Sequence, residues 1–184
     1  LLFDSIEIAD WEIVLESFPD GRHTFPDLDG DPADIDDTAV ANGSDNGDLF
    51  ITTLSYIRAH RGTVIFDDYG SNWSAVTPNF DITVTKLEDY RGQVTFSNGT
   101  VQIGSYEPIT ASVQAEFGIV GSDVMFDRLD LETNGTISHL VGKVETANWP
   151  EQHYEVQSEG DLGVLRDIFF AHDPFTVGGM GHFG

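Results

Sequence analysis

The feature that most constrains this chain is a run of alternating apolar and polar residues from Ile109 to Phe117. Its odd positions carry Ile109, Ala111, Val113, Ala115 and Phe117, and its even positions are polar. Successive side chains of a β-strand point to opposite faces, so this period of two predicts a strand with one buried and one wet face. The strand is therefore expected to belong to a sheet with one apolar face.

Shorter alternating segments surround this run. They are centred on Val64 and Phe66, Ile82 and Val84, Val94 and Phe96, Val101 and Ile103, and Val124 and Phe126. Turn-forming residues separate them at Asp68-Tyr69-Gly70, Asn98-Gly99, Gly121-Ser122 and Asn134-Gly135. Asn-Gly pairs favour tight type I′ hairpins, whose two central residues need φ > 0. The pattern predicts an antiparallel meander in which neighbouring strands pair in sequence, with a bulge near Asp127 where Leu129 and Leu131 change phase.

One segment breaks the alternation. Between residues 161 and 172, Leu162, Leu165 and Ile168 recur at helical spacing, Asp161 can cap the start, and Pro174 follows the end. A short helix is expected there. A meander with one apolar face can become a sandwich, a barrel or an open trough, and its periodicity does not choose among them.

Composition excludes several function classes. The 184 residues carry a formal net charge of −24 with only 8 Lys and Arg, so binding to a nucleic-acid backbone is not expected. The chain has no Cys, which excludes disulfides and thiolate metal sites. No stretch approaches 18 apolar residues, the length of a membrane-spanning helix. The sequence begins at Leu1 without Met and is interpreted as a piece of a longer protein.

Residues 27–48 form an acidic segment rich in Asp, Gly and Pro, which predicts a solvated, disordered linker. Asp27-x-Asp29-x-Asp31 is similar to the start of a calcium loop, but Pro32 and Thr38 stand where that loop needs Gly and a bidentate Glu. The six His residues lack zinc-site spacing, and no nucleophile elbow or phosphate loop is present. No enzyme activity, metal or cofactor is therefore predicted.

Several short motifs occur in a distinctive order. They are residues 57–68 (Ile-Arg-Ala-His-Arg-Gly-Thr-Val-Ile-Phe-Asp-Asp), Asn79–Val84, Tyr90–Gly92, Phe96–Val101, Tyr106–Pro108, Asn148–Gln152 and Ile168–Asp173. This order resembles the TamB-like branch of the AsmA superfamily of Gram-negative-type bacteria. The opening from Ile6 to Pro26 resembles the segment that precedes this region in AsmA-type proteins. The resemblance divides the chain into an AsmA-like strand segment (1–26), the acidic linker (27–48) and a TamB-like groove segment (49–184).

The resemblance implies an all-β fold, an antiparallel meander curled into an open, taco-shaped groove. Family members are periplasmic proteins anchored in the inner membrane by an N-terminal helix, which this sequence lacks. They are implicated in moving phospholipid to the outer membrane, some pair with a BamA-type outer-membrane barrel, and they were first described in outer-membrane protein assembly. The family offers no catalytic residues to carry over.

A groove for acyl chains needs a smooth apolar lining that keeps the chains out of water. Removing each CH₂ group from water lowers the free energy by about 0.8 kcal/mol. The residues expected to line it are Val64, Phe66, Ile82, Val84, Val94, Phe96, Val101, Ile103, Ile109, Val113 and Phe117. In a second interpretation, the same residues form the dry core of an acidic β-sandwich, a binding or adhesion module that uses the acidic loop for calcium or a partner. A third interpretation is a structural spacer whose groove carries nothing.

Overall fold

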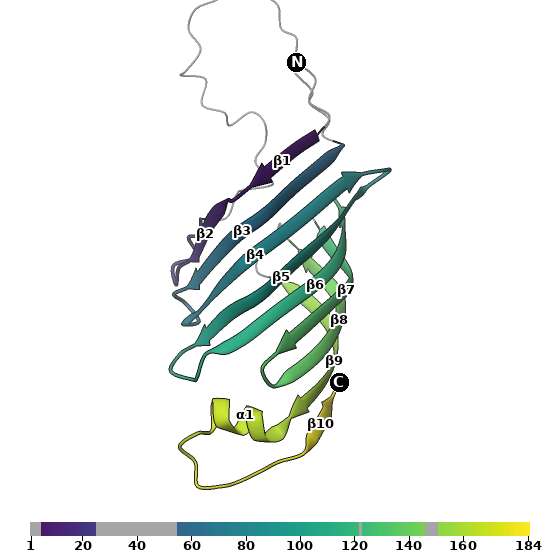
Figure 1. The fold of residues 1–184 in the computed structure, drawn as a ribbon. Helices are drawn as coiled ribbons and strands as arrows, with labels where there is room; N and C mark the ends of the chain where they lie inside the picture. Colours follow the sequence, from purple (N-terminus) through teal and green to yellow (C-terminus); the bar gives the residue numbers. More distant parts are fainter. Residues whose placement is uncertain (1–4, 25–54, 122, 146–150) are drawn as a thin grey trace, which may run out of the picture.

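A computed structural model describes residues 5–24, 55–121, 123–145 and 151–184 of the chain. They form a single open, curled sheet of ten strands that does not close into a barrel, together with one short helix (Figure 1). The predicted fold class is confirmed. The strands are β1 (Ser5–Ala9), β2 (Glu12–Ser17), β3 (Tyr56–Asp68), β4 (Trp73–Lys86), β5 (Tyr90–Ile103), β6 (Ile109–Val120), β7 (Asp123–Thr133), β8 (Thr136–Glu145), β9 (Gln152–Asp161) and β10 (Met180–Phe183).

The meander prediction is correct from β3 onward and wrong for the first two strands. Strands β3 to β10 pair antiparallel in sequence order. In contrast, β1 and β2 both pair parallel to β3, β1 with Tyr56–His60 and β2 with Thr63–Asp68. Alternation reports which face a side chain occupies but not the direction of the neighbouring strand. Residues 27–48, the expected linker, lie outside the described residues.

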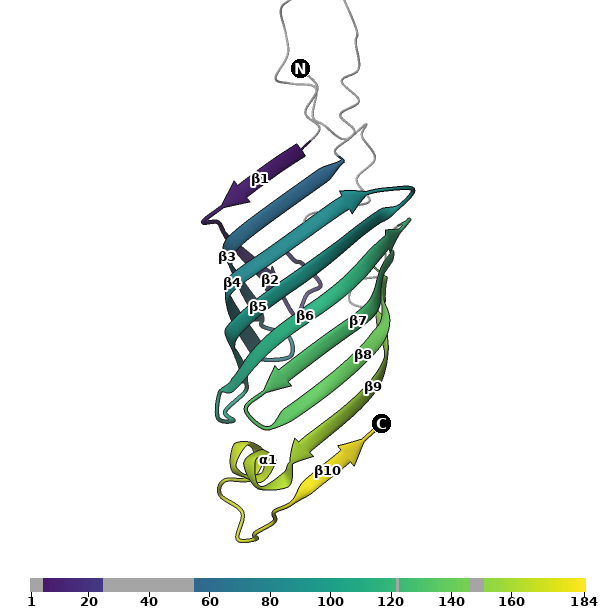
Figure 2. The same ribbon diagram turned by 45° about the vertical axis from the view of Figure 1, so that its right-hand side comes forward.

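Left-handed backbone positions occur within the sheet itself. Arg61, Asn79 and Asn98 have φ of 53°, 55° and 58°, and Asp10, between β1 and β2, has φ of 54°. Pairing shifts register beside Arg61 and between Phe96 and Gly99. Such bulges bend the strands that carry them. In Figure 2 the long strands curve as they stack from β1 to β10, so the sheet forms a trough.

Asn98-Gly99 is therefore a bulge inside β5, and the expected hairpin turn there was wrong. Bulges and type I′ turns both need left-handed residues, for which Asn and Gly are the common choices, so the two look alike in sequence. Asn134-Gly135 does join β7 to β8, although neither residue has a positive φ. The bulge near Asp127 is confirmed by the register shift between Phe126 and Leu129.

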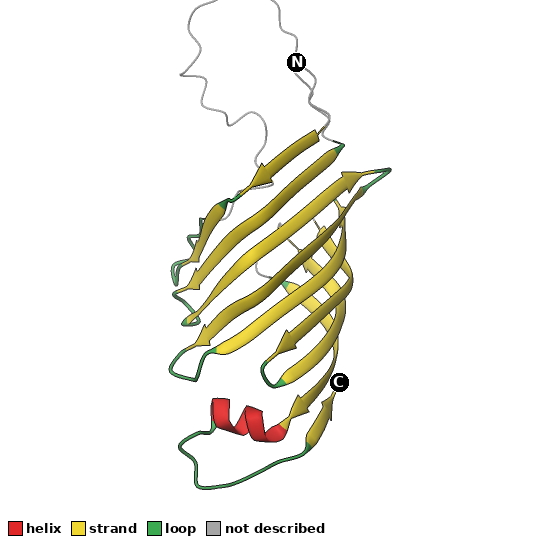
Figure 3. Ribbon diagram, viewed as in Figure 1, coloured by secondary structure: helices red, strands yellow, loops and turns green. Residues whose placement is uncertain are grey.

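The predicted helix is α1 (Leu162–Phe169), drawn in red in Figure 3. The Asp161 carboxylate accepts hydrogen bonds from the backbone N–H groups of Gly163 and Val164, which confirms it as the N-cap. Phe175 and Val177 lie in the segment between α1 and β10. In the described ranges no helix is long and apolar enough to cross a membrane.

Candidate functional site: an apolar trough

Strand register places all eleven predicted lining residues on one face of the sheet. One lateral row runs through Ile82, Val94 and Ala115 and continues across β7, β8 and β9 as Leu129, Leu140 and Val156. A second row joins Phe66, Ala75, Val101 and Ile109. We call this surface the trough face. What it binds stays a prediction.

The trough face is the more sheltered side of the sheet. Ala115 is 1% exposed and Phe117 is 7% exposed, whereas Gln114 and Glu116 on the opposite face are exposed. Side chains crowd together on the inside of a curled sheet and spread apart on the outside. This contrast therefore assigns the apolar residues to the inner side of the curl.

Helix α1 lies on this same side, at the hairpin ends. A Cβ built on Gly160, a trough-face position, would stand 3.1 Å from the Leu165 Cδ1 atom. The Phe169 ring meets Tyr106 of the β5–β6 turn edge-on, with 5.3 Å between ring centroids. The helix thus runs from the end of β9 toward the β5–β6 turn and covers one end region of the trough face.

No second sheet covers the trough face within the part of the chain that the structure describes. Each strand pairs only with neighbours in the one sheet. None of the large side chains there is fully buried, and Ile103 and Val156 remain 37% and 40% exposed. The described residues therefore do not form the dry sandwich considered as the alternative core.

Aromatic rings lie over glycines of adjacent strands. A Cβ on Gly92 would stand 2.3 Å from the Phe117 Cζ atom, and one on Gly142 would stand 2.6 Å from the Tyr154 Cδ1 atom. The glycines leave room for the rings to lie flat and smooth the apolar surface. Sequence reasoning did not include Gly92, Gly142 or Tyr154 in the lining, because the pairing that joins them appears only with the register.

Trp11 extends this pattern at the junction of β1 and β2. A Cβ on Gly62 would stand 2.2 Å from the Trp11 Cε2 atom, and the indole meets Phe80 edge-on at 5.7 Å. The indole nitrogen of Trp11 is buried and has no hydrogen-bond partner among the described residues. Trp11 therefore seals the bulge region by apolar contact rather than by a hydrogen bond.

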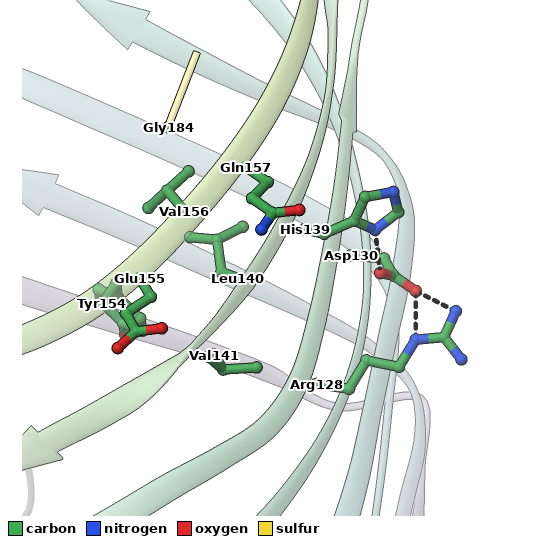
Figure 4. A pocket seen from close by; sticks show the side chains of 10 residues that line it. All are labelled: Arg128, Asp130, His139, Leu140, Val141, Tyr154, Glu155, Val156, Gln157 and Gly184. Carbon is green, nitrogen blue, oxygen red and sulfur yellow. Dashed lines mark hydrogen bonds and ion pairs between the residues drawn. The ribbon is translucent and has the colours of Figure 1, made fainter. Parts of the chain in front are cut away.

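Charged side chains gather on the outer face. Arg91 pairs with Asp127 at 2.7 Å, and Asp130 binds both Arg128 and His139. Figure 4 shows Asp130 between these two partners in a shallow cleft. The hydrogen bond from His139, followed by that from Arg128, holds the pKa of Asp130 below its usual value. Both partners are engaged by Asp130, so this cleft presents no uncommitted cation.

Between the strand ends, the described strand residues of the trough face carry no Asp, Glu, Lys or Arg. The exceptions by register are Asp68 at the end of β3 and Lys86 at the end of β4. Asp68 is held by its own turn, where it accepts hydrogen bonds from the N–H groups of Gly70 and Ser71. Polar groups appear near α1, where the Ser158 hydroxyl donates to Ser138 at 2.7 Å.

The described residues do not test the calcium loop and offer no grouped metal ligands. The segment from Asp27 to Asp31 lies outside the described residues. Among the residues that are described, no three His, Asp or Glu side chains are grouped so that they could hold a metal ion.

No family model, no curated protein and no solved structure matches this chain. The resemblance to the TamB-like branch therefore stays a prediction, and the geometry of the trough is the basis for the proposed function.

Proposed function

We propose that this chain is a segment of a bacterial envelope protein that shields or conducts phospholipid acyl chains along its trough face. The full-length protein would lie in the periplasm, be held to the inner membrane by an N-terminal anchor, and pass lipid toward the outer membrane. A BamA-type barrel is the proposed outer-membrane partner, with a supporting role in outer-membrane protein assembly. These wider roles follow from the resemblance, while the trough supports lipid binding directly.

The observation that carries the proposal is an apolar inner face that is free of charge between its rims and uncovered by a second layer in the described residues. A folded domain normally buries such a face against another element. Val94, Val113 and Leu131 instead lie on a continuous surface that remains half-buried. Hydrocarbon is the ligand that such a surface accommodates without specific polar contacts.

The energetics favour a continuous lining over a specific pocket. Exposing an acyl chain of roughly 16 carbons to water costs on the order of 10 kcal/mol at about 0.8 kcal/mol per CH₂. Apolar contact along the trough offsets that cost at each step. Shielding of this kind requires neither a metal nor a catalytic group.

The test is site-specific photocrosslinking of the full-length protein in cells. A photoreactive amino acid at Phe96 or Phe117 is expected to capture lipid, because both side chains lie on the trough face. Thr110 and Gln114 are matched controls on β6, since both are exposed on the opposite face. Equal labelling at all four positions, or none at any, would contradict the proposal.

A purified sample provides a second readout. Phospholipid that co-purifies with the chain and is identified by mass spectrometry is expected for a lipid-carrying trough. A spacer would carry none, and an acidic binding module would instead gain thermal stability from calcium.

A further inference from the structure

One basic side chain of this acidic protein differs from the others. All eight Lys and Arg lie in the described ranges, and seven of them pair with a carboxylate, namely Arg22, Arg58, Arg61, Arg91, Arg128, Lys143 and Arg166. Lys86 makes no ion pair with any residue in these ranges. In a chain with a net charge of −24, Lys86 is therefore the one Lys or Arg that no carboxylate of the described residues pairs with.

Lys86 stands at the rim of the trough. It is the last residue of β4 and pairs with Tyr90, the first residue of β5. Its ammonium group lies 5.1 Å from the centre of the Tyr90 ring, a cation–π distance that holds the charge in place. The side chain is only half-buried, so a ligand arriving from solvent can reach it.

The apolar lining begins immediately below this charge. Val84, two residues earlier in β4, lies on the same face and pairs with Gly92, which in turn pairs with Phe117. Two residues along a strand span roughly 7 Å. A molecule with a charged head and an apolar tail could therefore touch Lys86 with the head while its tail lies on Val84 and Phe117.

We propose that Lys86 and Tyr90 form a headgroup site that binds the phosphate of a phospholipid whose acyl chain lies in the trough. This inference rests on the proposed lipid function and adds a polar recognition point to it. The ammonium group supplies the positive charge, and the Tyr90 ring positions it. The outer surface, dominated by carboxylates, repels a phosphate elsewhere.

The adjoining turn favours one class of headgroup. Glu88 and Asp89 follow Lys86 in the β4–β5 turn, and both are exposed. A phosphate that carries its own ammonium group, as in phosphoethanolamine, places the phosphate on Lys86 and the ammonium beside these carboxylates. A phosphoglycerol headgroup brings no such cation. The site therefore selects a zwitterionic phosphate headgroup over a net anionic one.

The test compares ligands that share one acyl chain and differ in the headgroup. The three ligands are monoacylglycerol, lysophosphatidylethanolamine and lysophosphatidylglycerol, each used below its micelle concentration. Binding to the purified chain is measured as displacement of the neutral fluorophore N-phenyl-1-naphthylamine. Lysophosphatidylethanolamine is expected to bind about fivefold more tightly than monoacylglycerol, the factor typical of one cation near a lipid headgroup. Lysophosphatidylglycerol is expected to fall between them.

Lys86→Gln is expected to remove the preference for phosphate and leave monoacylglycerol binding unchanged. Lys143→Gln is the matched control, because Lys143 is already paired with Glu145 away from the trough face. Circular dichroism is the check that both variants are folded. Inorganic phosphate in the millimolar range is expected not to displace the fluorophore or the lysolipid.

The outcomes separate the two proposals. If the wild-type chain binds none of the acyl ligands, the trough function itself is wrong. If monoacylglycerol binds but the phosphate preference survives in Lys86→Gln, the headgroup site is wrong while the trough function stands. Displacement of the lysolipid by inorganic phosphate would show a free-phosphate site and would also overturn the headgroup assignment.

Discussion

Gly92 is a sensitive position for testing the packing of the trough face. In Gly92→Ala the new Cβ would stand 2.3 Å from the Phe117 Cζ atom and 2.8 Å from the Thr83 carbonyl oxygen. Both distances are below van der Waals contact, so the ring must leave its rotamer and the β4 backbone must shift. Overpacking of this kind costs about 1–3 kcal/mol, and Ala recovers roughly 0.5–1 kcal/mol relative to Gly within a strand. Because a backbone oxygen must move as well as the ring, we expect an overpacking cost of about 2–3 kcal/mol and a net loss of about 1–2.5 kcal/mol.

The assay is urea unfolding followed by tryptophan fluorescence. Gly178→Ala is the matched control, because a Cβ there meets nothing within 4 Å, and we expect its stability to stay within about 0.5 kcal/mol of wild type. In a Phe117→Leu background the Gly92→Ala change should cost less, since the clashing ring is gone. Wild-type stability of Gly92→Ala, or effects that simply add in the double variant, would refute the proposed packing.

Three further predictions concern the helix cap, a bulge and an ion pair. Asp161→Ala removes the cap of α1 and should lower the free energy of unfolding by about 0.5–2 kcal/mol in urea, with Asp161→Asn close to wild type. Asn98 lies at φ 58°, a left-handed conformation that Asn and Gly tolerate better than Ala, so Asn98→Ala should lose about 1 kcal/mol in the same assay and Asn98→Gly should not. The lowered pKa of Asp130 means that its stabilising effect is present above the ordinary value of 3.8 and is lost as pH falls through its folded-state pKa. His139→Gln should raise that pKa in an NMR titration, and an unchanged pKa would show that His139 has no part in it.

The pattern of residues within a single segment was enough to predict those features of the site that involve only one strand or helix. The odd positions from Ile109 to Phe117 do share a face, and the Asp161 cap does begin a helix. The parallel pairing of β1 and β2 was missed because alternation contains no information on strand direction. Asn98-Gly99 was misread because a bulge and a hairpin turn require the same left-handed backbone.

Other features depend on which residues meet across strands. The cover of Gly92 by Phe117 follows from the β5–β6 register, and nothing in either segment alone indicates it. The segment around Lys86 likewise does not indicate by itself that this residue has no acidic partner among the described residues. Its lack of an ion pair becomes visible only when the seven other cations have been matched with their acidic partners among the described residues.

The amino-acid sequence by itself determined that this protein has a sheet with one apolar and one charged face, because the direction of a strand side chain follows from its position parity. Only the tertiary structure decided that the apolar face lies inside the curl and is left uncovered by a second sheet in the described residues. Curvature arises from bulges at residues such as Arg61 and Asn79, and coverage depends on contacts between distant segments. Neither property is encoded in the period of a single strand.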